Sequence, residues 1–124
     1  MHDNHLNFLI RQPYMAPYPS PLLCVQCFLR TSSSAADYDL TGQIIWPAAT
    51  LLADYLGERP NIMTGRRAAC ELGSGVGLTG LVCGQFCNTV LTDHNKIVLK
   101  VLQENVGRNP SQHKVRYFCP ACYP

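Results

Sequence analysis

Glycines and acids near the middle of the chain could bind a nucleotide-like cofactor. The stretch ACELGSGVGLTG places Gly73, Gly75, Gly77 and Gly80 within eight positions, directly after a short apolar run. Glycines let the backbone approach a ligand that side chains would exclude. The helix that follows such a turn points its positive N-terminal end at a negatively charged group. The turn therefore predicts a site for a cofactor with a ribose and a charged group.

The glycine spacing fits two registers, and each predicts a different cofactor. Gly75, Gly77 and Gly80 give G-x-G-x-x-G, the dinucleotide fingerprint. Gly73, Gly75 and Gly77 give G-x-G-x-G, with Glu71 two residues before them. An acid repels a pyrophosphate but attracts the sulfonium and ammonium groups of S-adenosylmethionine. Glu71 therefore favours S-adenosylmethionine, and a nicotinamide dinucleotide bound by an oxidoreductase is the alternative.

A second acid, Asp93, ends the next predicted strand, twenty residues past Gly73. A carboxylate in this place can accept hydrogen bonds from both ribose hydroxyls. It supports a nucleoside ligand without choosing between the two cofactors. Two other interpretations remain open. Asp93 could simply cap the following helix, and the glycines could form a tight turn that binds nothing.

The elements around the glycine turn alternate between strand and helix. Apolar runs and helical periodicity predict strands over 67–72, 88–93 and 114–118 and helices over 77–86 and 94–106. Asn95 is the expected cap of the second helix. A β-α-β-α-β order indicates a parallel sheet with right-handed crossovers, the first half of a doubly wound α/β fold. Such a half sheet leaves an open edge beside its first strand and an uncovered apolar face.

The segment before this unit contains one clear helix. Pro47 suits a first helical turn, Ala48, Leu51, Leu52, Tyr55 and Leu56 recur at helical spacing, and Gly57 is a natural stop.

Residues 1–43 read as a Pro-rich arm, extended or disordered, with a short strand over 24–30 and then a polar loop. We expect a partial domain over 44–118, containing the cofactor-binding half, and a divergent tail over 119–124.

Composition restricts the class of protein. The chain has 124 residues, 47% of them hydrophobic and 15% charged, with a net charge of +2. The absence of a basic stripe argues against nucleic-acid binding, and no apolar run approaches the length of a membrane span. Seven cysteines without a leader pattern favour a reducing compartment, the cytoplasm or the nucleus. We expect a monomer.

Two C-x-x-C pairs, CVQC at 24–27 and CPAC at 119–122, could together bind zinc. The 91 residues between Cys27 and Cys119 are far more than zinc-ribbon spacing, and the histidines have no ligand spacing. We therefore expect no metal site.

Three segments, DLTGQIIWPAATLLADYL, ACELGSGVGLTGLV and VLTDHNKIVLKVLQENV, resemble methyltransferase family 16 over about residues 37–109. This resemblance implies a seven-strand, Rossmann-like, S-adenosylmethionine-dependent enzyme, with a protein lysine as its usual substrate. It implies that Trp46 lies against the cofactor and that Asp93 holds the ribose. It assigns the methionine-side cradle to Glu71, Gly73, Ser74, Gly75 and Gly77. Without the resemblance, a core anchor for the adjacent helix is the simpler role for Trp46.

The sequence also departs from the family pattern. Lys96 stands where an acid is common, and the chain ends in or just after its third strand. The family continues with further strands and an acid-x-x-aromatic motif that lines the lysine channel. We therefore expect a truncated product with no useful methyl transfer and no identifiable catalytic residue. A non-catalytic or poorly folded fragment is the alternative.

Overall fold

A computed structural model describes residues 3–10, 23–30, 41–111 and 113–119, with the side chains of Val25 and Cys27 alone in the first two segments. Three stretches lie outside these residues: the proline cluster over 11–22, residues 31–40 of the predicted polar loop, and all of the predicted tail over 119–124 except Cys119.

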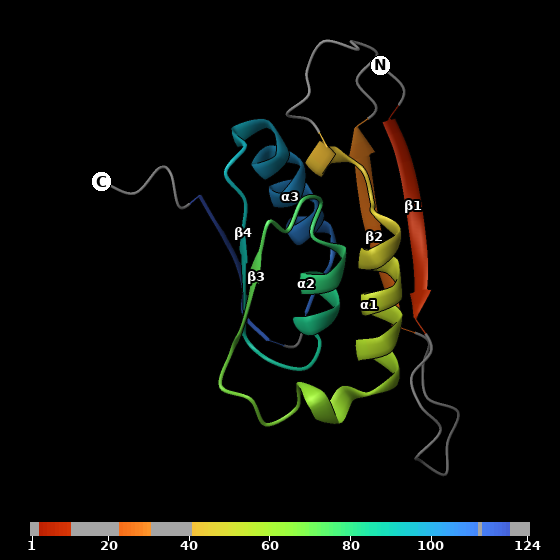
Figure 1. Ribbon diagram of the computed structural model, residues 1–124, viewed down its shortest axis with the longest axis vertical. Helices are drawn as coiled ribbons and strands as arrows, with labels where there is room; N and C mark the ends of the chain where they lie inside the picture. The colour runs from red at the N-terminus through yellow and green to blue at the C-terminus, as the bar shows by residue number, and fades with distance from the viewer. Residues whose placement is uncertain (1–2, 11–22, 31–40, 112, 120–124) are drawn as a thin grey trace.

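A parallel sheet of three strands positions the glycine turn (Figure 1). Its strands are β3 (Ala69–Leu72), β4 (Thr89–Thr92) and β5 (Val115–Phe118), in the spatial order β3-β4-β5. Helix α2 (Leu78–Cys83) connects the first two strands and α3 (Lys96–Arg108) connects the second pair. The predicted α/β class and β-α-β-α-β order are confirmed, although α2 is shorter than expected.

All three α-helices lie on one side of the sheet (Figure 1). In α3 the buried residues are Val98, Val101, Leu102 and Asn105, the face that the periodicity predicts. The Asn95 side chain caps this helix and accepts hydrogen bonds from the Ile97 and Val98 amides at 2.8 and 3.3 Å. The predicted cap is therefore confirmed.

Helix α1 (Pro47–Glu58) buries only part of the face that the apolar periodicity predicts. Ala53, Leu56 and Gly57 are buried, whereas Leu51 and Leu52 are exposed. Among the five residues of the predicted periodicity, Leu56 alone is buried. Gly57 does not end the helix, which contradicts the expected stop.

The N-terminal segment forms a β-hairpin, whose second strand confirms the strand predicted over 24–30 and whose first strand the sequence did not predict. Strand β1 (Asp3–Ile10) pairs antiparallel with β2 (Leu23–Arg30), so residues 3–10 are a paired strand rather than a loose arm. The hairpin lies on the far side of the helices from the sheet (Figure 1). Val25 and Cys27 of β2 are fully buried in one core with Leu81 and Val82 of α2. The hairpin is therefore a third layer of the fold.

The sheet has an exposed edge and an exposed face within the described residues. β3 pairs with β4 alone, and Leu72 at its end is 80% exposed. Cys70 and Phe118, on the same side of the sheet as Leu72, are also exposed. The expectation of an open edge and an uncovered apolar face holds here. No helix in the described segments combines the length and apolar character required for a membrane span.

Candidate functional site

The glycine turn adopts a left-handed backbone that other residues rarely take. The φ angles of Gly73, Gly75 and Gly77 are +64°, +54° and +91°. Space beside Gly73 is open, so a ligand can approach its backbone. A Cβ on Gly75 would lie 2.9 Å from the Gly42 carbonyl oxygen. The turn is thus open to a ligand at its first glycine and closely packed at its second.

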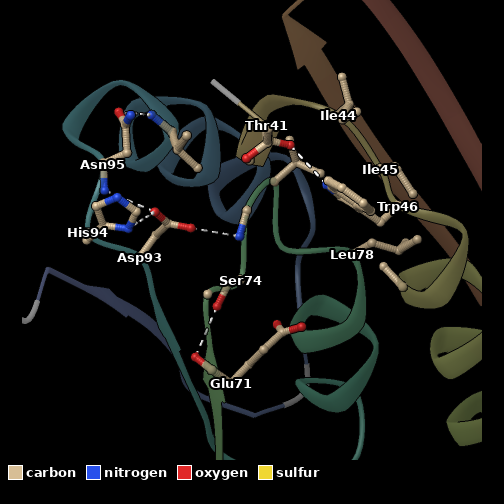
Figure 2. Close-up of a pocket in the computed structure, with 16 residues that line it drawn as sticks. Thr41, Ile44, Ile45, Trp46, Glu71, Ser74, Leu78, Asp93, His94 and Asn95 are labelled. Atoms are coloured by element: carbon tan, nitrogen blue, oxygen red, sulfur yellow. Dashed lines mark hydrogen bonds and ion pairs between the residues drawn. The ribbon is translucent and has the colours of Figure 1, made fainter. Parts of the chain in front are cut away.

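A pocket of about 340 Å³ lies at the carboxyl ends of β3 and β4 (Figure 2). Ligands of open α/β sheets bind at this edge. Of the sequence-predicted residues, the pocket brings together Trp46, Glu71, Gly73, Ser74, Gly75 and Asp93. Gly77 does not line it. Gly77 instead precedes α2 and packs against the Leu102 side chain.

Asp93 fixes the turn through its buried carboxylate. Its Oδ2 accepts a hydrogen bond from the Gly75 amide at 3.1 Å, and its Oδ1 accepts one from the Asn95 amide at 3.0 Å. The His94 imidazole lies 3.6 Å from Oδ1. Asn95, rather than Asp93, is the helix cap. Each carboxylate oxygen has two lone pairs, so Asp93 retains the capacity to accept further hydrogen bonds.

Ser74 joins the ends of two strands. Its hydroxyl donates to the Glu71 carbonyl at 3.1 Å and accepts from the Thr92 amide at 2.9 Å. The Ser74 amide donates to the Thr92 carbonyl at 2.8 Å. These bonds hold the glycine turn and the end of β4 in one arrangement.

Glu71 carries the unsatisfied group of the site. Its Oε2 atom is buried and has no hydrogen-bond partner among the described residues. Removal from water raises the pKa of this carboxyl group from 4.5 to about 7. The Gly80 amide, and then the Thr79 and Ser74 hydroxyls, oppose the rise in part. The side chain extends from β3 toward the first turn of α2 (Figure 2).

Trp46 stands beside the pocket and is not part of the core. Its side chain is 55% exposed, and its Nε1 donates to the Thr41 carbonyl at 3.1 Å. Figure 2 shows the ring close to Ile45 and Leu78. The simpler interpretation of Trp46 as a core anchor is therefore wrong.

Asn105 supports the turn, and the sequence reasoning missed this role. It is fully buried in α3, and its Nδ2 donates to the Val76 carbonyl at 2.8 Å. Asn105 lies one helical turn after Val101 and Leu102, on an otherwise apolar face. This position was the available signal, because a buried amide needs a hydrogen-bond partner.

The described cysteines are free thiols. Burial raises the pKa of both Cys27 and Cys83 to about 12, which keeps them protonated. No cluster of three or more potential metal ligands occurs in the described segments. A zinc site from both C-x-x-C pairs would also need Cys24 and Cys122, whose side chains lie outside them.

This arrangement, a parallel sheet with helices and a pocket at the carboxyl ends of its strands, is that of an α/β protein with a Rossmann-like sheet. Residues 30–118 match the lysine methyltransferase family, and the chain belongs to that family.

Curated relatives agree with this assignment. The chain is 38% identical over 84 residues to human protein-lysine N-methyltransferase EEF2KMT, which covers 65% of this chain and 25% of that protein. It is 36% identical over 69 residues to human methyltransferase-like protein 22, and this match covers 55% of this chain and 17% of that protein. It is 33% identical over 81 residues to calmodulin-lysine N-methyltransferase of Arabidopsis thaliana, and this match covers 62% of this chain and 26% of that protein. The chain spans about a quarter or less of each relative.

Proposed function

We propose that this chain is the S-adenosylmethionine-binding part of a protein-lysine methyltransferase. The observation that carries the proposal is Glu71, a carboxylate that faces a pocket beside a left-handed glycine turn and lacks a partner for Oε2. A cationic ligand in the pocket would balance the negative charge of this carboxyl group. The pyrophosphate of a dinucleotide would add negative charge beside it.

The residues of the pocket fit S-adenosylmethionine in four places. Glu71 would attract its positive charges, and Asp93 would accept hydrogen bonds from the ribose. The open backbone at Gly73 would allow close approach, and the exposed ring of Trp46 would cover an apolar part of the ligand. Ser74 and Gly77 would act through the backbone, by keeping the turn in its shape. We propose that residues 44–118 form the cofactor-binding half of a partial domain, and Thr41 and Gly42 before it also line the site.

The bound cofactor supplies an electrophilic methyl group on sulfur. The role of this chain is to bind and orient that group, because methyl transfer depends mainly on alignment with the attacking amine. We assign no catalytic base to the described residues.

Protein lysines are the proposed substrate class. Two of the relatives carry lysine methylation in their names, and one of these names calmodulin as the protein acted on. We further propose that the chain is a monomer of the cytoplasm or nucleus that binds neither nucleic acid nor membranes.

Ligand-dependent thermal stability tests the proposal. At pH 8 we expect S-adenosylhomocysteine and S-adenosylmethionine to raise the melting temperature and NAD to leave it unchanged. A ligand at one hundred times its Kd stabilises the folded state by about 2.7 kcal/mol. Asp54→Asn changes an exposed acid of α1 and should behave as the parent chain. A shift with NAD, or with none of the ligands, would contradict the proposal.

A further inference from the structure

The packing around Glu71 leaves its negative charge unbalanced. The charged or titratable groups that line the pocket with it are Asp93 and His94, at the end of β4. On the side of the core, the thiols of Cys27 in β2 and Cys83 in α2 are close enough to interact with its charge. Among the described residues, no Lys or Arg lines this pocket.

The first turn of α2 compensates for this charge only in part. A Cβ on Gly80 would lie 2.6 Å from Oε2, so the carboxyl group reaches the beginning of the helix. The helix has six residues, and Oε2 still has no hydrogen-bond partner in the described structure. A buried carboxylate without a hydrogen-bond partner is unstable relative to its protonated form. In the empty pocket the carboxyl group is therefore neutralised by binding a proton.

We propose that Glu71 holds a proton in the empty pocket and releases it to solvent when a cationic cofactor binds. The inference rests on the proposed function and deepens it. The O–H bond of the Glu71 carboxyl group breaks, a buffer base takes the proton, and the positive charge of the ligand in the pocket balances the carboxylate that remains. Glu71 thereby determines specificity for a ligand with positive charge, and cofactor binding is coupled to pH.

The expected pH dependence follows from the pKa of about 7 for the Glu71 carboxyl group. At pH 6 the Glu71 carboxyl group is ionised in about one tenth of the ligand-free molecules. The apparent affinity for the ligand should therefore be roughly tenfold lower than at pH 8. Proton release per ligand bound should be about 0.9 at pH 6, about 0.5 at pH 7 and about 0.1 at pH 8.

Isothermal titration calorimetry with S-adenosylhomocysteine measures both quantities. Each titration is run in two buffers that differ in ionisation heat, phosphate and Bis-Tris at pH 6 and 7, and phosphate and Tris at pH 8. The difference in binding heat between the buffers gives the number of protons released. The amino group of the ligand can itself exchange protons with the buffer. The same ligand is therefore titrated into the parent chain and into Glu71→Gln, and the two proton counts are compared.

We expect the parent chain to show the release described above and Glu71→Gln to bind weakly, without that release and without the tenfold pH effect. Glu104→Gln, an exposed acid on α3, is the matched control and should behave as the parent chain. His94→Asn removes the imidazole at the pocket and should keep the proton release.

Equal proton counts in the parent chain and in Glu71→Gln would overturn the inference while leaving cofactor binding in place. If Glu71→Gln does not fold, the parent chain alone decides, because no release at pH 6 contradicts the inference. Absence of binding at every pH, to both S-adenosylhomocysteine and S-adenosylmethionine, would overturn the proposed function as well.

Discussion

The two edges of strand β3 differ sharply in how they are organised. Toward β4, side chains brace the backbone: Ser74 ties β3 to β4, and Asp93 holds the Gly75 amide at 3.1 Å. The opposite edge has no paired strand among the described residues, and Leu72 is 80% exposed. The difference indicates that hydrogen bonds between the ends of β3 and β4 hold the glycine turn, whereas no described strand supports the opposite edge.

The largest expected effect concerns catalysis by this 124-residue chain. We expect methyl transfer to a protein lysine to be more than about a thousandfold slower than in a full-length relative, because alignment of the amine contributes most of such a rate. Transfer of a labelled methyl group from S-adenosylmethionine measures this. Turnover near that of a relative would show that the open side of β3 does not limit the site, and it would remove the contrast between the two edges.

The next effect concerns Asn105. Asn105→Ala should lower the free energy of unfolding by about 2–4 kcal/mol, since it leaves the buried Val76 carbonyl unpaired and creates a cavity. Chemical denaturation provides the measurement. Glu104→Ala, at the exposed neighbouring position, is the control and should change stability by less than about 0.5 kcal/mol. Similar values for both variants would mean that α3 does not support the turn.

A smaller effect is expected at Gly75. Gly75→Ala puts a Cβ 2.9 Å from the Gly42 carbonyl oxygen at a φ of +54°. We expect a loss of about 1–3 kcal/mol in stability and weaker binding of S-adenosylhomocysteine. Gly107→Ala in α3 meets no neighbouring atom within 4 Å, and it should be neutral or stabilise by up to about 1 kcal/mol. Equal effects at the two glycines would contradict the strain assigned to the turn.

The smallest effect is expected on the open side of β3. Leu72→Ser should change the free energy of unfolding by less than about 0.5 kcal/mol, because its side chain is already 80% exposed. Thermal or chemical unfolding checks this. A loss above about 2 kcal/mol would show that Leu72 is covered in solution, and the two edges of β3 would then be more alike than the structure indicates.

Local patterns predicted the part of the fold that local contacts determine. Apolar runs located β3 and β4, and the periodicity of α3 gave its buried face. The spacing of Glu71, Gly73 and Asp93 likewise predicted that these residues meet, because the carboxyl ends of neighbouring parallel strands lie at one edge.

Other features depend on distant parts of the chain, so the sequence did not reveal them. Strand β1 is defined by pairing with β2, across a proline-rich segment. The buried face of α1 contains Ala53, Leu56 and Gly57, whereas Leu51 and Leu52, which share the predicted apolar periodicity, are exposed. The unpartnered Oε2 of Glu71 depends on the position of α2, which a spacing pattern does not contain.

We propose that the glycine turn, Glu71 and Asp93 form a site for a cationic methyl-donor cofactor. An NMR titration of the isotope-labelled chain with S-adenosylhomocysteine at pH 8 tests this site residue by residue. We predict saturable shifts concentrated at the amides of Gly73, Gly75 and Asp93, and none of comparable size with NAD. Shifts elsewhere in the chain, or equal shifts with NAD, would contradict the claim.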